Sequence, residues 1–162
     1  MLFRSVVLSN LYRTLMTFDP FKPDGLTGDL AERVDISASG LEYRFTLRAD
    51  AKFDSGAPVT AQDVVYSLQR AVKMNKSPSF MLTQIGLTAA SVDGALHASS
   101  GNVVTITLPQ ALASGLVLAT FSTTVSGIVE QKTVIQHDVN GDMGSLWLRK
   151  HSAGSEIGRA HV

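Results

Sequence analysis

The clearest pattern of apolar and polar positions along the chain is an alternation at residues 41–48. In this stretch, LEYRFTLR, the side chains of Tyr43, Phe45 and Leu47 alternate with charged and hydroxyl groups. A period of two places the aromatic and aliphatic groups on one face of a strand and the charges on the other. The stretch VVTITLP at 103–109 shows the same alternation. Both stretches therefore predict strands of a sheet with one buried face.

A spacing of three to four residues marks a helix that begins after the turn FDSGAPV. Val64, Leu68 and Val72 form its apolar stripe. Thr60 stands three residues before Asp63, an acidic variant of the capping box, in which each side chain bonds a backbone amide of the other residue. Helix capping therefore explains the polar groups crowded at this joint better than catalysis does.

Weaker patterns complete the expected order of elements. We expect helices at 6–17, at 111–121 and around Trp147, a short strand running into a helix at 127–137, and a loop at 91–102. Strands and helices interleave along the chain, which predicts a mixed α/β fold.

Composition narrows the classes of partner. The chain has 162 residues, 44% of them apolar, which suits one globular domain with a buried core. Its 14 basic and 14 acidic residues balance, so there is no electrostatic reason to expect nucleic acid as a partner. The absence of cysteine excludes disulfides, thiolate catalysis and cysteine-based zinc sites. No stretch approaches the roughly 20 apolar residues of a membrane span.

Motifs that bind phosphates, activate a serine or hold a metal are missing from the sequence. It contains no G-x-G-x-x-G, no Walker A loop and no G-x-S-x-G, and its four histidines lack the H-E-x-x-H spacing. DVNGD at 138–142 is similar to a calcium loop, but its glycine comes fourth instead of sixth and Arg149 stands where the loop needs glutamate. We expect a solvated turn there, and neither cofactor nor metal.

An enzyme remains as an alternative class of protein. A small hydrolase or isomerase would need Asp54, Asp63 and His97 to converge in one pocket with perturbed ionisation. Asp50 and Asp54 are a further conceivable carboxylate pair, although carboxylates of surface loops are far commoner.

The order of several segments resembles the extracytoplasmic solute-binding proteins of family 5, the dipeptide, oligopeptide and nickel receptors of ABC importers. The segments are NLYRTLMTFDP, LAERVDISASGLEYRFTLRADAKFDSGAPVTAQDVVYSLQRA, SPSF, VTITLPQALA and HSAGS. The similarity spans about 7–155 and is strongest at 41–68. Departures are small, such as Ala51 where the family often has valine and Ser55 where it often has aspartate.

The resemblance implies a type 2 periplasmic-binding-protein fold, in which two lobes close on a ligand and present it to a membrane permease. Family members are much longer, so the chain would hold part of this fold, mainly the first lobe and its small subdomain. The implied function is capture of a dipeptide, oligopeptide or similar small solute for an ABC importer, outside the cytoplasmic membrane or in the periplasm. This function involves no chemical reaction.

The resemblance also points to two site residues. SPSF is similar to a family segment near the ligand, which maps the contact to Ser79 with Phe80 beside it. The family often has an aromatic residue where this chain has Ser79. A surface loop ordered by proline is the alternative interpretation of this segment.

Both ends of the chain match translations of sequencing adapters, MLFRS at 1–5 and EIGRAHV at 156–162. We therefore expect 6–155 to be the partial solute-binding domain. Such a piece would leave strand edges and apolar faces uncovered, so we expect aggregation or partial unfolding. If both ends are genuine, a stand-alone interaction domain becomes the alternative.

Overall fold

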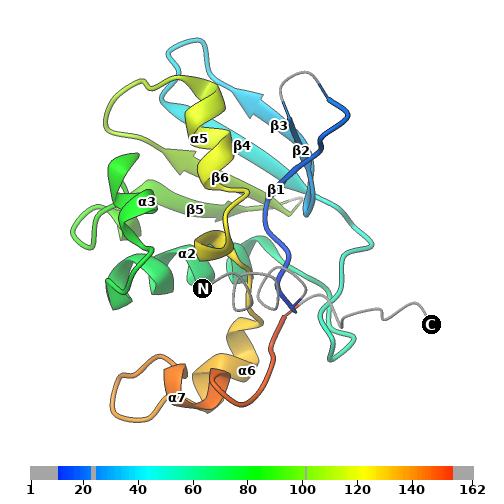
Figure 1. Ribbon diagram of the computed structural model, residues 1–162, viewed down its shortest axis with the longest axis vertical. Helices are drawn as coiled ribbons and strands as arrows, with labels where there is room; N and C mark the ends of the chain where they lie inside the picture. Colours follow the sequence, from blue (N-terminus) through cyan, green and yellow to red (C-terminus); the bar gives the residue numbers. More distant parts are fainter. Residues whose placement is uncertain (1–10, 23–24, 101, 155–162) are drawn as a thin grey trace.

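A four-stranded antiparallel sheet lies at the centre of the molecule (Figure 1). The computed structural model describes residues 11–22, 25–100 and 102–154. The sheet order is β3 (Ala31–Ile36), β4 (Glu42–Leu47), β6 (Val103–Thr107) and β5 (Leu96–Ser99). Both strands predicted from the alternating patterns are confirmed, and they pair with each other, with Phe45 opposite Val104.

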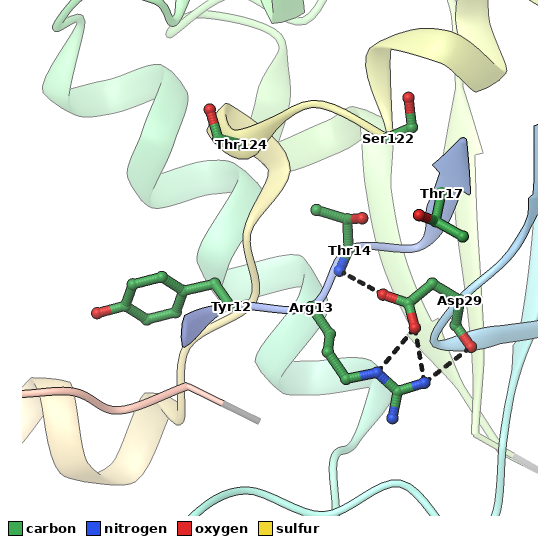
Figure 2. A pocket seen from close by; sticks show the side chains of 7 residues that line it. All are labelled: Tyr12, Arg13, Thr14, Thr17, Asp29, Ser122 and Thr124. Atoms are coloured by element: carbon green, nitrogen blue, oxygen red, sulfur yellow. Dashed lines mark hydrogen bonds and ion pairs between the residues drawn. The ribbon is translucent and has the colours of Figure 1, made fainter. Parts of the chain in front are cut away.

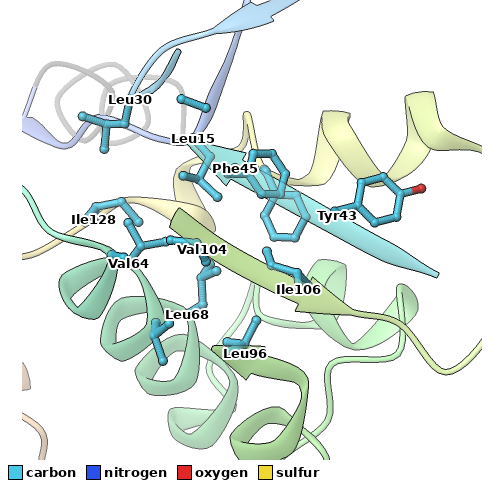
Figure 3. Close-up of a cluster of buried hydrophobic side chains, with 14 of the residues drawn as sticks. Leu15, Leu30, Tyr43, Phe45, Val64, Leu68, Leu96, Val104, Ile106 and Ile128 are labelled. Carbon is cyan, nitrogen blue, oxygen red and sulfur yellow. The ribbon is translucent and has the colours of Figure 1, made fainter. Parts of the chain in front are cut away.

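One face of this sheet is buried, as the alternation predicts. Tyr43 and Phe45 are fully buried, whereas Arg44 between them is exposed. Val104 and Ile106 extend the same apolar face on β6, and helix α2 (Ala61–Met74) packs against β5 and β6 (Figure 3). The ring of Phe121 meets Phe45 edge to face at 5.5 Å between centroids. Burial of these apolar side chains contributes most of the free energy that stabilises the packing of the helices on the sheet.

The capping box predicted at the start of α2 is present. The Asp63 amide donates to the Thr60 hydroxyl oxygen at 3.3 Å, and the Thr60 amide donates to the Asp63 carboxylate at 3.0 Å. The same carboxylate accepts from the amide of Gln131 at 2.9 Å. Asp63 therefore joins the first turn of α2 to the first turn of α6 (Gln131–Gln136).

The other helices are short. They are α3 (Phe80–Gln84), α4 (Val92–Ala95), α5 (Ser114–Thr120), the 3-10 turn η1 (Thr124–Ser126) and α7 (Ser145–Leu148). The helix expected around Trp147 is confirmed, and the one expected at 111–121 is shorter, with Leu116 55% exposed. Within the described part of the chain no strand lies at 127–130, which corrects the strand expected there. The loop expected at 91–102 is also wrong, because α4 and β5 lie within it.

The helix expected at 6–17 is wrong over its second half, because residues 12–15 are not helical and β1 (Met16–Phe18) follows them. This strand pairs with β2 (Leu26–Gly28) in a separate two-stranded sheet. Its backbone is also tied to distant segments, since the Met16 amide donates to the carbonyl of Phe121 at 3.2 Å. Residues 6–10 lie outside the described part, as do both ends assigned to adapters.

The first and last described segments meet. A Cβ atom on Gly154 would collide with the carbonyl oxygen of Leu11. Glycine at this position therefore allows the two segments to come into contact. The Gly154 carbonyl accepts from the amide of Asp54 at 3.1 Å. Figure 1 shows the blue beginning and the red end of the described chain side by side.

Candidate functional site

Two adjoining cavities lie beside the segment that enters β1, and Tyr12 and Thr124 line both of them. Each cavity has a volume of about 210 Å³. A volume of this size holds several water molecules or one small organic group. In the first cavity, the segment that carries Tyr12, Arg13 and Thr14 runs between η1 and the loop that carries Asp29 (Figure 2).

An ion pair forms one wall of the first cavity. Arg13 and Asp29 approach to 2.6 Å, and the Arg13 guanidinium also donates to the Asp29 carbonyl at 3.2 Å. The second carboxylate oxygen of Asp29 accepts from the amide of Thr14 at 3.1 Å. Both charges are therefore satisfied within the protein, and the pair fixes the entry to β1 instead of offering a free charge.

Hydroxyl groups form the rest of the first cavity. The Thr14 hydroxyl donates to the carbonyl of Met16 at 2.5 Å and the Ser122 hydroxyl to the carbonyl of Ala119 at 2.8 Å. The hydroxyls of Thr17 and Thr124 bond to no other group within the described residues. These two hydroxyls can therefore bond a polar solute.

The second cavity carries a cation. Arg70 projects from α2 into its lining, beside Ser67 and Ala71 on the same helix face. Its Nε donates to the carbonyl of Met143 at 2.7 Å. Burial lowers the pKa of Arg70 from its ordinary value, an effect that the neighbouring Tyr66 partly offsets. Burial also raises the pKa of Tyr12, another residue of this lining.

Neither Ser79 nor Phe80 lines these cavities. Ser79 directly precedes α3 and is only 2% exposed, and its amide donates to the carbonyl of Lys76 at 2.7 Å. Phe80, the first residue of α3, is 53% exposed. Of the two, Phe80 is therefore the one whose side chain is free to meet a solute, and the assignment of both stays a prediction.

The three residues of the hydrolase alternative are committed to separate contacts. Asp63 bonds to backbone amides in the first turns of α2 and α6. His97 bonds through Nε2 to the carbonyl of Gly94 at 2.9 Å. Neither of them lines either cavity, and nor does Asp54. Partial burial raises the pKa of Asp54, which lies 3.5 Å from the Ser152 hydroxyl. The geometry thus gives no support to a hydrolase built from these residues.

The loop that is similar to a calcium site uses its carboxylates in another way. Asp142 accepts from the amides of Val139, Gly144 and Leu146, and Asp138 accepts from the amide of Met143. Within the described ranges, no group of three or more potential ligands is placed to hold a metal ion. None of the helices described is long and apolar enough to cross a membrane.

Sequence reasoning missed Arg13, Asp29 and Arg70. Their signal is weak, because arginine and aspartate at these positions look like ordinary surface charges. Arg13 and Asp29 are 16 residues apart and meet only because β1 and the segment after β2 run together.

Comparison with known proteins adds what the geometry alone does not give. Residues 25–155 match the model of the bacterial extracellular solute-binding proteins, family 5 Middle. The chain belongs to this family. The resemblance noted in the segments from NLYRTLMTFDP to HSAGS is thereby confirmed.

Individual relatives agree with the family 5 assignment. The chain is 30% identical over 141 residues to the probable D,D-dipeptide-binding periplasmic protein DdpA of Escherichia coli, covering 83% of this chain and 25% of that protein. The substrate-binding domain of an oligopeptide ABC transporter from Bacillus anthracis superposes with a TM-score of 0.71 at 26% identity, covering 83% of this chain and 27% of that one. MoaA of A. tumefaciens, in complex with mannopinic acid, superposes with a TM-score of 0.62 at 29% identity. The superposition covers 83% of this chain and 26% of MoaA.

These family 5 structures confirm the predicted fold, a partial type 2 periplasmic-binding-protein fold of the α/β class. The chain spans about a quarter of the length of the relatives it matches. The family members are solute-binding proteins and not enzymes.

Proposed function

We propose that this chain is part of the capture component of an ABC importer, which binds a dipeptide, an oligopeptide or a similar small solute without chemical reaction. The observation that supports it most is the family 5 match over residues 25–155. The names of the relatives differ in solute, from D,D-dipeptide to oligopeptide to mannopinic acid, so the proposal stops at this class.

The same comparison supports a partner and a compartment for the proposed receptor. The relative from Bacillus anthracis is the substrate-binding domain of an ABC transporter, and the one from Escherichia coli is periplasmic. We extend both properties to this protein, with permease subunits in the membrane as its partner and an extracytoplasmic or periplasmic location.

Ser79 and Phe80 are the proposed ligand contacts in this part of the receptor. Exposure favours the Phe80 ring, because more than half of it is accessible while Ser79 is buried. An exposed aromatic ring on a short helix gives a solute a large apolar surface to pack against. Ser79 is buried directly before α3, so it is the secondary contact of the two.

A chimera tests the proposal directly. Residues 11–154 replace the matching part of DdpA, and isothermal titration calorimetry measures binding of a panel of D,D-dipeptides, L-dipeptides and L-oligopeptides. We expect saturable binding of at least one member of the panel. A folded chimera that binds none of them, beside a native DdpA that does, contradicts the proposal.

Phe80→Ala in the chimera tests the contact. We expect a loss of affinity of about tenfold, because truncating an aromatic contact removes packing against the solute. Phe21→Ala is the matched control, since Phe21 is 95% exposed and lies in the segment between β1 and β2. Equal affinities of the two variants would exclude Phe80 as a contact.

A further inference from the structure

Arg70 is a cation without a close counter-ion. The ion pairs of the described residues join Arg13 to Asp29, Arg33 to Asp35, Arg44 to Glu42 and Lys73 to Asp93, and none includes Arg70. The guanidinium has five N–H donors, and among the residues that the structure describes only Nε–H has a partner, the carbonyl of Met143. The terminal nitrogens of this partly buried group therefore have no hydrogen-bond partner in the described ranges 11–22, 25–100 and 102–154.

The nearby carboxylate of Asp142 does not fill this role. Its two oxygens already accept three backbone amides, those of Val139, Gly144 and Leu146. It acts on Arg70 only through longer-range attraction, since no ion pair within 4.0 Å joins them. Arginine keeps its charge under physiological conditions, so the second cavity retains positive potential.

The remaining lining of the second cavity is mixed. Val125, Val129 and Leu148 supply apolar surface, and Thr124 supplies a hydroxyl that bonds to nothing else in the described chain. The hydroxyl of Ser67 is unavailable, because it donates to the carbonyl of Asp63 at 2.6 Å and accepts from the amide of Val129 at 3.0 Å. Arg70, the free hydroxyl of Thr124, the side chain of Tyr12 and aliphatic side chains therefore surround a volume of about 210 Å³.

We propose that the second cavity is a binding site for the carboxylate of a small organic acid with a short aliphatic part. A guanidinium presents two parallel donors that match the two oxygens of a carboxylate, and this charge-assisted pair is stronger than a neutral one. The valine and leucine side chains take up the aliphatic part, as in most small-molecule sites. The site is separate from the Ser79–Phe80 segment, so it goes beyond the proposed solute capture.

The test compares isobutyrate with isobutyramide, its neutral analogue of the same shape, at constant ionic strength. Binding to the 162-residue chain is followed by calorimetry and by the NMR signal of the Arg70 Nε–H group, which the Arg70→Lys variant identifies. We expect saturable isobutyrate binding with a dissociation constant of roughly 1–10 mM, in keeping with so small a ligand. The amide should bind at least about tenfold more weakly.

Variants separate a binding site from a structural clamp. Arg70→Gln should weaken isobutyrate binding more than about tenfold. Arg33→Gln, which removes an exposed charge on β3, should leave it unchanged. Ala71→Leu keeps Arg70 but fills the cavity, so it should also abolish binding. This variant tests the cavity even if the Arg70→Gln protein is too unstable to measure.

Three results overturn the proposal: equal binding of acid and amide, equal effects of Arg70→Gln and Arg33→Gln, or no saturable binding of isobutyrate. The same titrations are made on the chimera that contains residues 11–154. The chimera can therefore be measured even if the 162-residue chain self-associates. Capture of peptides by that chimera is measured separately, so failure of the carboxylate site and failure of the proposed function are distinguishable.

Discussion

At the scale of single residues, Tyr43 shows a polar group buried at a cost. Its ring is fully buried in the sheet face, and its hydroxyl has no hydrogen-bond partner among the described residues. Burial raises the pKa of Tyr43. Removing a buried group that is not hydrogen-bonded relieves its desolvation cost. We therefore expect Tyr43→Phe to raise the free energy of unfolding by about 1 kcal/mol, measured by urea denaturation.

Tyr12→Phe is the matched control for this prediction. The Tyr12 hydroxyl lies within hydrogen-bonding reach of Ser152 and the backbone of Ala153, contacts that counteract the effect of burial on its pKa. Its removal should therefore not stabilise the protein. A Tyr43→Phe variant that is less stable than the parent would show that the hydroxyl has a partner in solution.

The carboxylate of Asp142 predicts a dependence of stability on pH. The amides of Val139, Leu146 and Gly144 lower its pKa below the ordinary value of 3.8, and Arg70 adds to the effect. Because the folded pKa lies below the unfolded one, the stabilisation is complete above pH 3.8 and is lost as the pH falls through the folded pKa.

The check on this pH dependence is the free energy of unfolding of the parent and of Asp142→Asn between pH 7 and pH 2. We expect the parent to be more stable at neutral pH and the difference to shrink as the pH falls through 3.8, where half of the carboxylate is protonated in the unfolded state. A difference that does not change with pH would assign the effect to shape and not to charge.

Residues whose role depends on near neighbours in sequence could be predicted. Thr60 and Asp63 are three positions apart and cap the helix as expected. Arg70 could not be recognised, because its contact is the carbonyl of Met143, 73 residues away, and no short-range pattern encodes such a pair.

At the scale of elements, the joint between α2 and α6 rests on one carboxylate. Thr60→Ala removes the hydroxyl of the cap and should lower the free energy of unfolding by about 1 kcal/mol. Asp63→Ala also leaves the amide of Gln131 without its acceptor, so we expect a larger loss of about 2 kcal/mol. Urea denaturation of both variants measures the difference.

Gln62→Ala serves as the control for the two capping variants, because Gln62 is exposed and lies between them in the first turn of α2. Its stability should stay within about 0.5 kcal/mol of the parent. If Asp63→Ala cost no more than Thr60→Ala, the bond to α6 would contribute nothing.

The elements that could be predicted are those whose pattern matches their burial. β4 and β6 alternate in sequence and in exposure. β3 does not, because a register shift between Ala31 and Arg33 breaks its alternation. β1 was mistaken for a helix because both Leu15 and Met16 are buried, so strand periodicity is missing there.

At the scale of the whole molecule, the described sheet has two edge strands, and several apolar side chains are open to solvent. β3 and β5 form the two edges of the central sheet, and Phe18, Phe21 and Leu146 are each more than half exposed. Such features favour association of chains. Aggregation or partial unfolding of the 162-residue chain stays a prediction, which light scattering after size-exclusion chromatography checks. A sharp melt from a monodisperse monomer would contradict it.

The contact between Gly154 and Leu11 has a practical consequence. Because the chain enters and leaves the described part at one place, a short linker can join residue 154 to residue 11 without crossing the molecule. New ends can then be opened in the exposed turn at 139–141, away from the sheet. Domains with adjoining ends tolerate such circular permutation. Residues 11–154 can therefore be inserted into a loop of a host protein through two adjoining attachment points.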